Sequence, residues 1–334
     1  MQRSLSHDEV TLGSVRKNST GSCQSPRALS LDPAVNCRSP NCSRPEIMEI
    51  PVFVLDAFTN VAFKGNPAAV CPLMQELDDS LYQKIAAEMN LSETAFITRT
   101  NPSDTFATGS KFHLRWFTPT TEVNLCGHAT LASAAALFLF EKNINSTLMF
   151  ETRSGLLAVT QQKDGYLMDF PLNPPTKQEP NEFIDLVQAA VGNNPVQDVV
   201  LSSVTKKLMI RLSDSCDRSV LTNLKVDPVA LLNADNSGRV KSLLITMKGS
   251  PECQPGYDFY SRVFAPWSGI PEDPVTGSAH TVLAAYWSKV LGKKIMTAYQ
   301  CSSRGGKLEL EVRDDGRVNI SGKVTSILQG TIRL

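Results

Sequence analysis

The chain has 334 residues, of which 42% are apolar, and 33 basic side chains balance 33 acidic ones. This balance argues against nucleic acid or an anionic membrane as the main partner. The longest apolar run is too short to span a bilayer, and the length leaves room for two domains. The eight cysteines form no CxxC pair. We therefore expect a soluble, cytoplasmic protein with reduced thiols rather than a disulfide framework.

Residues 1–47 are rich in Ser, Arg, Asn and Pro and show neither a helical nor a strand period. Such a segment cannot bury enough apolar surface to order itself, so we predict a disordered extension. It lacks the apolar core of a secretory signal, and Asp8 and Glu9 weigh against a mitochondrial presequence. A strand-like run begins at Met48, which could serve as an alternative start.

Beyond Met48, strand and helix patterns alternate, which indicates a mixed α and β class. The predicted strands cover residues 50–58, 94–100, 112–118, 167–171, 243–247 and 308–312. The predicted helices cover residues 78–89, 129–142, 181–192 and 279–292.

The chain contains an internal repeat. The stretch "FTPTTEVNLCGHATLASAAAL" has the same landmarks, in the same order, as "FAPWSGIPEDPVTGSAHTVLAAYW". The matched residues are Phe117, Pro119, Glu122, Gly127, Ala129 and Ala135 against Phe264, Pro266, Glu272, Gly277, Ala279 and Ala285. A second matched block follows each stretch. The repeat predicts two similar halves, at residues 48–165 and 166–334, with the C-terminal strand able to cross over.

Each repeat places a glycine, Gly127 or Gly277, in the first turn of an apolar helix. A helix N-terminus offers unpaired N–H groups and a partial positive charge, and glycine lets a ligand approach the backbone. If both helices begin at one cleft, they could hold a carboxylate or an enolate between them. This is the charge that forms when a proton leaves the carbon beside a carbonyl. No G-x-G-x-x-G or P-loop motif supports dinucleotide or ATP chemistry.

Proton transfer also needs a base, and Glu93 is the best candidate. It lies between Ser92 and Thr94 and is followed by apolar residues 95–97, at the start of a predicted strand. Such a carboxylate could take a proton and return it as an acid. The alternative is a solvent-facing strand glutamate, which is the commoner case.

The polar residues near the two helix starts also have structural alternatives. His128 could be a neutral imidazole that caps its helix, because a cationic ring would oppose the helix dipole. Asp273 could be stabilised by the dipole, and Ser278 could bond first-turn amides. Cys126 and His128 supply at most two of the four ligands of a structural zinc site, so we expect no metal.

Four blocks, "DAFTNVAFKGNPAAVC", "LSETAFI", "LRWFTPTTEVNLCGHAT" and "EDPVTGSAH", resemble signature blocks of the PhzF family, the phenazine biosynthesis-like proteins. The resemblance extends from Met48 to Leu334. It implies an α+β, diaminopimelate-epimerase-like fold of two pseudo-symmetric halves, each a curled sheet around a central helix. It also implies an isomerase that uses acid/base chemistry without a cofactor, commonly as a homodimer.

Under this resemblance, Glu93 takes a proton from carbon and delivers it elsewhere on the substrate. His128, Asp273 and Ser278 bind the substrate or relay protons, and Asn66 contacts it. With the two helix-start glycines, the expected site comprises Asn66, Glu93, Gly127, His128, Asp273, Gly277 and Ser278.

Two other functions remain open. Related epimerases and racemases use one thiol from each half, but the position equivalent to Cys126 is Thr276, which disfavours that chemistry. Cys126 is then expected to be a small buried residue. A non-enzymatic binding or scaffold protein that kept the fold is the second alternative, because a fold does not fix a function. We favour an isomerase acting on a small carboxylate-bearing metabolite.

Overall fold

The computed structural model describes residues 48–179, 181–250 and 256–334, so the extension predicted at residues 1–47 lies outside the described residues. Ile47–Leu334 forms one compact unit. Every helix in the described ranges is too short or too polar to traverse a lipid bilayer.

The first run of elements builds a sheet around one buried helix. Its pairings are β1–β2 antiparallel, β2–β3 parallel, β3–β4 antiparallel and β4–β6 parallel, followed by antiparallel β6–β7–β8. The elements are β1 (Glu49–Ala57), β2 (Asn66–Leu73), α1 (Asp79–Met89), β3 (Glu93–Arg99), β4 (Lys111–Phe117), β5 (Glu122–Val123), α2 (Gly127–Leu139), β6 (Thr147–Thr152), β7 (Gly155–Gln162) and β8 (Gly165–Pro171).

The second run repeats these pairings strand for strand, from β10 to β17. Its elements are β9 (Thr176–Lys177), α3 (Ile184–Val191), β10 (Val196–Ser202), β11 (Lys207–Leu212), α4 (Arg218–Asn223), α5 (Pro228–Ala234), β12 (Ser242–Lys248), β13 (Phe259–Ala265), η1 (Pro266–Ser268), β14 (Ile270–Asp273), α6 (Gly277–Leu291), β15 (Ile295–Gln300), β16 (Gly306–Val312), β17 (Arg317–Gly322) and β18 (Val324–Arg333). The sequence repeat is therefore a structural repeat.

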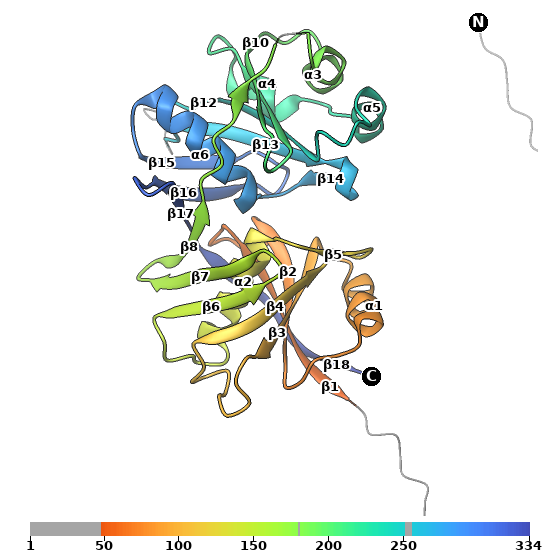
Figure 1. The fold of residues 1–334 in the computed structure, drawn as a ribbon, viewed down its shortest axis with the longest axis vertical. Coiled ribbons are helices and arrows are strands. Elements are labelled where there is room, and N and C mark those ends of the chain that lie inside the picture. Colours follow the sequence, from red (N-terminus) through yellow and green to blue (C-terminus); the bar gives the residue numbers. More distant parts are fainter. Residues whose placement is uncertain (1–47, 180, 251–255) are drawn as a thin grey trace, which may run out of the picture. The chain divides into compact units, whose positions relative to one another are not determined.

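The two runs are joined by hydrogen-bonded strands. β8 pairs with β17, and β18 returns to pair with β1, both antiparallel. Within the second run, β9 pairs antiparallel with β10. Figure 1 shows the strands in two groups, one around α2 and one around α6, with β18 lying beside β1. The division expected after Gly165 falls at the first residue of β8, and it stays a prediction.

The central helices are buried because their sequences are largely apolar, α2 on nearly every side and α6 over most of its length. All residues of α2 from Gly127 to Phe138 are buried, and most of α6 is buried as well. A helix that is apolar all round belongs in a core rather than on a surface. Residues of α2 and α6 belong to one continuous hydrophobic cluster.

A matching ion pair precedes each central helix. Arg115 binds both carboxylate oxygens of Glu122 at 2.8 Å, and Arg262 binds both oxygens of Glu272 at 2.8 and 2.9 Å. Each pair ties a long strand to the short strand that leads into the helix. The bidentate geometry fixes where each helix begins.

Candidate active site

The N-termini of α2 and α6 contact each other through glycine. A Cβ atom at Gly127 would lie 3.3 Å from the Cα of Gly277, and a Cβ atom at Gly277 would lie 3.4 Å from the Cα of Gly127. The N-cap residues, Cys126 and Thr276, are extended and make no side-chain cap hydrogen bond. Two uncapped sets of N–H groups, with the positive ends of two helix dipoles, therefore lie side by side.

Glu93 and His128 form a buried pair beside these helix starts. The Nε2 atom of His128 lies 3.0 Å from the Oε2 atom of Glu93, and the two side chains are 4% and 8% exposed. This contact lacks hydrogen-bond geometry, so neither atom has a hydrogen-bond partner among the described residues. The solvent-facing alternative for Glu93 is wrong. Buried polar atoms without hydrogen-bond partners are rare, so this pair is a candidate for a functional role.

Asn66 connects this pair to the second half. Its Nδ2 atom lies 3.0 Å from the Nδ1 atom of His128, donates to Asp273 Oδ1 at 2.7 Å and donates to the carbonyl of Val275 at 2.9 Å. The amide has two hydrogens, and the oxygens of Asp273 and Val275 accept both, because the Nδ1 atom of a protonated His128 carries a hydrogen and cannot accept. Asn66 is fully buried and contacts both His128 and Asp273.

Asp273 ends β14 and is 8% exposed. The pKa of Asp273 is raised to about 6: burial and the charge of Glu93 raise it, and His128 and the hydrogen bonds from Thr276 and Asn66 offset part of this rise. A carboxyl group with this pKa exchanges its proton near neutral pH, as proton relay requires.

His128 carries more positive charge than the helix dipole alone predicts. Burial lowers the pKa of His128, but Cys126 and Glu93 raise it, and the net pKa lies well above the usual value. Burial also raises the pKa of the Cys126 thiol to about 11, so this thiol is protonated at neutral pH. The raised pKa of His128 runs against the expectation of a neutral imidazole, which considered the dipole without the carboxyl group of Glu93 that the fold places opposite.

Ser278 and His280 are the polar residues of the first turns of α6. Ser278 is partly exposed, and its hydroxyl makes no hydrogen bond within the described ranges. His280 is buried, its Nδ1 atom lies 2.8 Å from the carbonyl of Thr276, and burial lowers its pKa to about 4. His280 is therefore neutral and structural, whereas the Ser278 hydroxyl is free to bind a ligand.

The structure adds two residues that the sequence gave no signal for. Lys207, at the start of β11, is partly buried; burial lowers the pKa of its amine to about 8, and the charge of Asp273 acts against this. Gln300 donates to the backbone carbonyl of Asp273 at 2.7 Å and accepts from the amide of Thr276 at 2.9 Å. Lys207 brings a cation near the cluster, and Gln300 fixes the loop that carries Asp273.

Glu93, Cys126 and His128 could also face a metal ion, since one donor atom of each lies within 4.8 Å of the others. These are three donors, and one is a thiol whose pKa is about 11. Metal ligation needs the thiolate, and a structural zinc site needs four protein ligands. The donor chemistry fits proton transfer better than metal binding.

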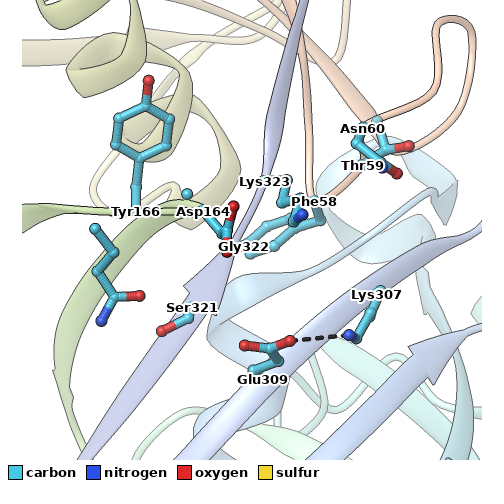
Figure 2. Close-up of a pocket in the computed structure, with 12 residues that line it drawn as sticks. Phe58, Thr59, Asn60, Asp164, Tyr166, Lys307, Glu309, Ser321, Gly322 and Lys323 are labelled. Carbon is cyan, nitrogen blue, oxygen red and sulfur yellow. Dashed lines mark hydrogen bonds and ion pairs between the residues drawn. The ribbon is translucent and has the colours of Figure 1, made fainter.

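A separate cavity of about 330 Å³ lies outside this cluster, and none of the predicted site residues lines it. Figure 2 shows it with Phe58, Lys323 and the ion pair between Lys307 and Glu309. The ring of Phe58 also lies 3.4 Å from the position of a Cβ atom at Gly277. Phe58 thus separates this cavity from the start of α6.

A family model described as phenazine biosynthesis-like protein matches residues 55–330. The chain belongs to this family, the PhzF family, as its signature blocks predicted.

Its relatives include a human protein and a bacterial one. The phenazine biosynthesis-like domain-containing protein of Homo sapiens is 57% identical over 85% of this chain and 99% of its own length. An uncharacterised isomerase of Halalkalibacterium halodurans is 39% identical over 86% of this chain and 100% of its own length.

Solved structures confirm the predicted fold. A PhzF family protein of Enterococcus faecalis superposes with a TM-score of 0.75 at 38% identity, covering 86% of this chain and 100% of that one. A hydroxyproline epimerase of Agrobacterium vitis superposes with a TM-score of 0.50 at 11% identity, covering 86% and 93%. The latter likeness shows the fold alone: the α+β architecture shared with epimerases and racemases.

Proposed function

We propose that this protein is a cofactor-independent isomerase that moves a proton on a small carboxylate-bearing substrate, with Glu93 as the base. One observation carries the proposal: Glu93 and His128 are buried together as a facing pair, with Oε2 and Nε2 3.0 Å apart, beside two uncapped helix N-termini. The isomerase names of bacterial relatives support the reaction class.

In this mechanism, Glu93 accepts a proton from the carbon beside a carbonyl group. The electron pair of the C–H bond moves toward the carbonyl oxygen, and the N–H groups near Gly127 and Gly277 stabilise the enolate. Protonated Glu93 then returns the proton to another carbon of the substrate. The step is redox-neutral and consumes no co-reactant.

The other residues position and stabilise these charges. The cationic ring of His128 offsets the growing negative charge, and Asn66 links it to Asp273. Ser278 offers its free hydroxyl to the substrate carboxylate. Lys207 strengthens the positive field on the side of Asp273.

The test is solvent deuterium uptake by a panel of small carboxylic acids, read by mass spectrometry. Glu93→Gln is expected to reduce uptake by about 10²–10⁴-fold, because it removes the general base. Glu88→Gln is the matched control, since Glu88 is exposed on α1. Uptake that persists in Glu93→Gln at the wild-type rate would reject Glu93 as the base.

The homodimer implied by the resemblance and the cytoplasmic location expected from the cysteine pattern stay predictions. Light scattering after size exclusion would test the first, and imaging of a tagged protein would test the second.

A further inference from the structure

A cavity of about 540 Å³ near α4 has an unbalanced charge. Its charged lining consists of Lys64, Arg218, Lys225, Arg262, Arg304 and a single carboxylate, Glu272. Lys64 belongs to the first run of elements, in the loop between β1 and β2, and the other charged lining residues belong to the second run.

Two of these cations are already neutralised. Arg262 binds both oxygens of Glu272, which therefore has no charge left to offer. Arg304 binds the buried carboxylate of Asp56 at 2.7 Å and the carbonyl of Gly65 at 2.8 Å. Both arginines are held as parts of the wall.

The remaining three cations, Lys64, Arg218 and Lys225, have no carboxylate partner in the part of the chain that the structure describes. The two nearest acidic residues in sequence, Asp217 and Asp227, accept the capping hydrogen bonds of α4 and α5 and form no ion pair with these cations in the described part of the chain. An anion in the cavity would therefore meet cations that nothing else neutralises.

Arg218 is held in position by aromatic rings. Its guanidinium lies 4.6 Å from the centre of the Tyr260 ring and 5.5 Å from that of Tyr299. Burial raises the pKa of Tyr299 and of the nearby Cys301 thiol, so both are uncharged at neutral pH. Stacking orients the planar guanidinium of Arg218 without neutralising its charge. The paired N–H donors of this group match the oxygens of a phosphate group.

Two residues in the wall of this cavity are hydrogen-bonded to the segments that contain the site residues Asp273 and Asn66. The Oγ atom of Ser302 donates to the carbonyl of Pro274 at 2.8 Å, and Pro274 directly follows Asp273. Arg304 donates to the carbonyl of Gly65, which directly precedes Asn66. The ligand would thus lie one wall away from the acid–base cluster.

We propose that this cavity is a binding site for a phosphate-bearing small molecule, held by Lys64, Arg218 and Lys225. A doubly charged oxyanion fits because three cations converge on one space and hydroxyl donors such as Thr222 and Ser303 line it too. The site is separate from the proposed catalytic cluster, and ligand binding there requires no turnover.

Isothermal titration calorimetry at constant ionic strength tests the proposal, with inorganic phosphate, pyrophosphate and citrate as probes. We expect pyrophosphate to bind with one-to-one stoichiometry, more tightly than phosphate and citrate. The double variant Arg218→Gln, Lys225→Gln should weaken pyrophosphate binding by at least about tenfold. Lys84→Gln, Lys289→Gln is the matched control, because both lysines are exposed on other helices.

Equal pyrophosphate affinity in the double variant and the wild type would overturn the site. Citrate that binds as tightly as pyrophosphate would overturn the phosphate assignment. The single variant Lys64→Gln keeps the test decisive if the double variant folds poorly, since Lys64 is exposed in a loop. It should also weaken binding, and pyrophosphate should raise the melting temperature of the wild type more than that of Lys64→Gln.

Discussion

The N-termini of α2 and α6 have the same backbone arrangement, but their side chains differ in chemistry. In each helix, the side chain of the fourth residue donates a hydrogen bond to the carbonyl of the N-cap residue. Thr130 donates to Cys126, and His280 donates to Thr276. The residue after the glycine differs, however. On α2 it is a buried histidine that faces Glu93, whereas on α6 it is a serine with a free hydroxyl.

This difference shows what the duplication keeps and what it changes. Gly127 and Gly277 keep the close contact that leaves two sets of N–H groups uncapped. The titratable pair Glu93 and His128 belongs to the first half only, and Asn66 connects this pair to Asp273 in the second half. We infer that both halves bind the anion, while one half moves the proton.

The strongest test is to make the α2 start resemble the α6 start. His128→Ser should reduce deuterium uptake by about 10²–10⁴-fold, because it removes the cation beside Glu93. Ser278→Ala should reduce uptake by only about tenfold, since it removes one hydrogen bond to the substrate. Equal losses in the two variants would contradict the asymmetry.

The equivalence of the two glycines gives the next test. Gly127→Val and Gly277→Val should each lower the free energy of unfolding by about 3 kcal/mol, because added atoms would overlap the opposite helix start. Urea denaturation measures both values. A large loss in one variant and none in the other would show that the contact is not shared.

The helix and strand patterns could be predicted from the sequence, because each depends on a local period. Every predicted strand and helix is present, with ends shifted by a few residues. The repeat predicted that a glycine begins each central helix, and the position of Glu93 at the start of a strand was visible as well.

Other parts of the site depend on pairings between distant segments. Asn66 meets Asp273 only because strands far apart in the chain converge at the two helix starts. The charge of His128 depends on Glu93, and Lys207 appears in the sequence as an ordinary strand residue. No local pattern carries such contacts.

The pH dependence of stability provides a third test. The pKa of Asp273 is about 6 in the folded chain, whereas the usual value for this carboxyl group is 3.8. The folded state therefore keeps the carboxyl proton of Asp273 to a higher pH than the unfolded state does. The stability that the proton contributes is complete below the unfolded pKa and is lost as pH rises through about 6. Asp273→Asn cannot titrate at this position.

The free energy of unfolding of the wild type, minus that of Asp273→Asn, should therefore fall by about 1–3 kcal/mol between pH 4 and pH 7. Urea denaturation at several pH values measures it, with Asp164→Asn, on an exposed turn, as the control. A difference that rises with pH would show that the pKa of Asp273 is lowered instead.

The smallest effect is expected at the N-cap position, because Cys126 and Thr276 both begin a helix there and we assign neither a part in the proton transfer. Cys126→Thr copies the N-cap of α6 and should change deuterium uptake by less than about threefold, because a buried thiol with a raised pKa is a small apolar residue rather than a base. Uptake is measured beside that of Glu93→Gln. A loss as large as that of Glu93→Gln would assign the proton transfer to the thiol, and the first half would then resemble the racemase chemistry that its partner position, Thr276, cannot complete.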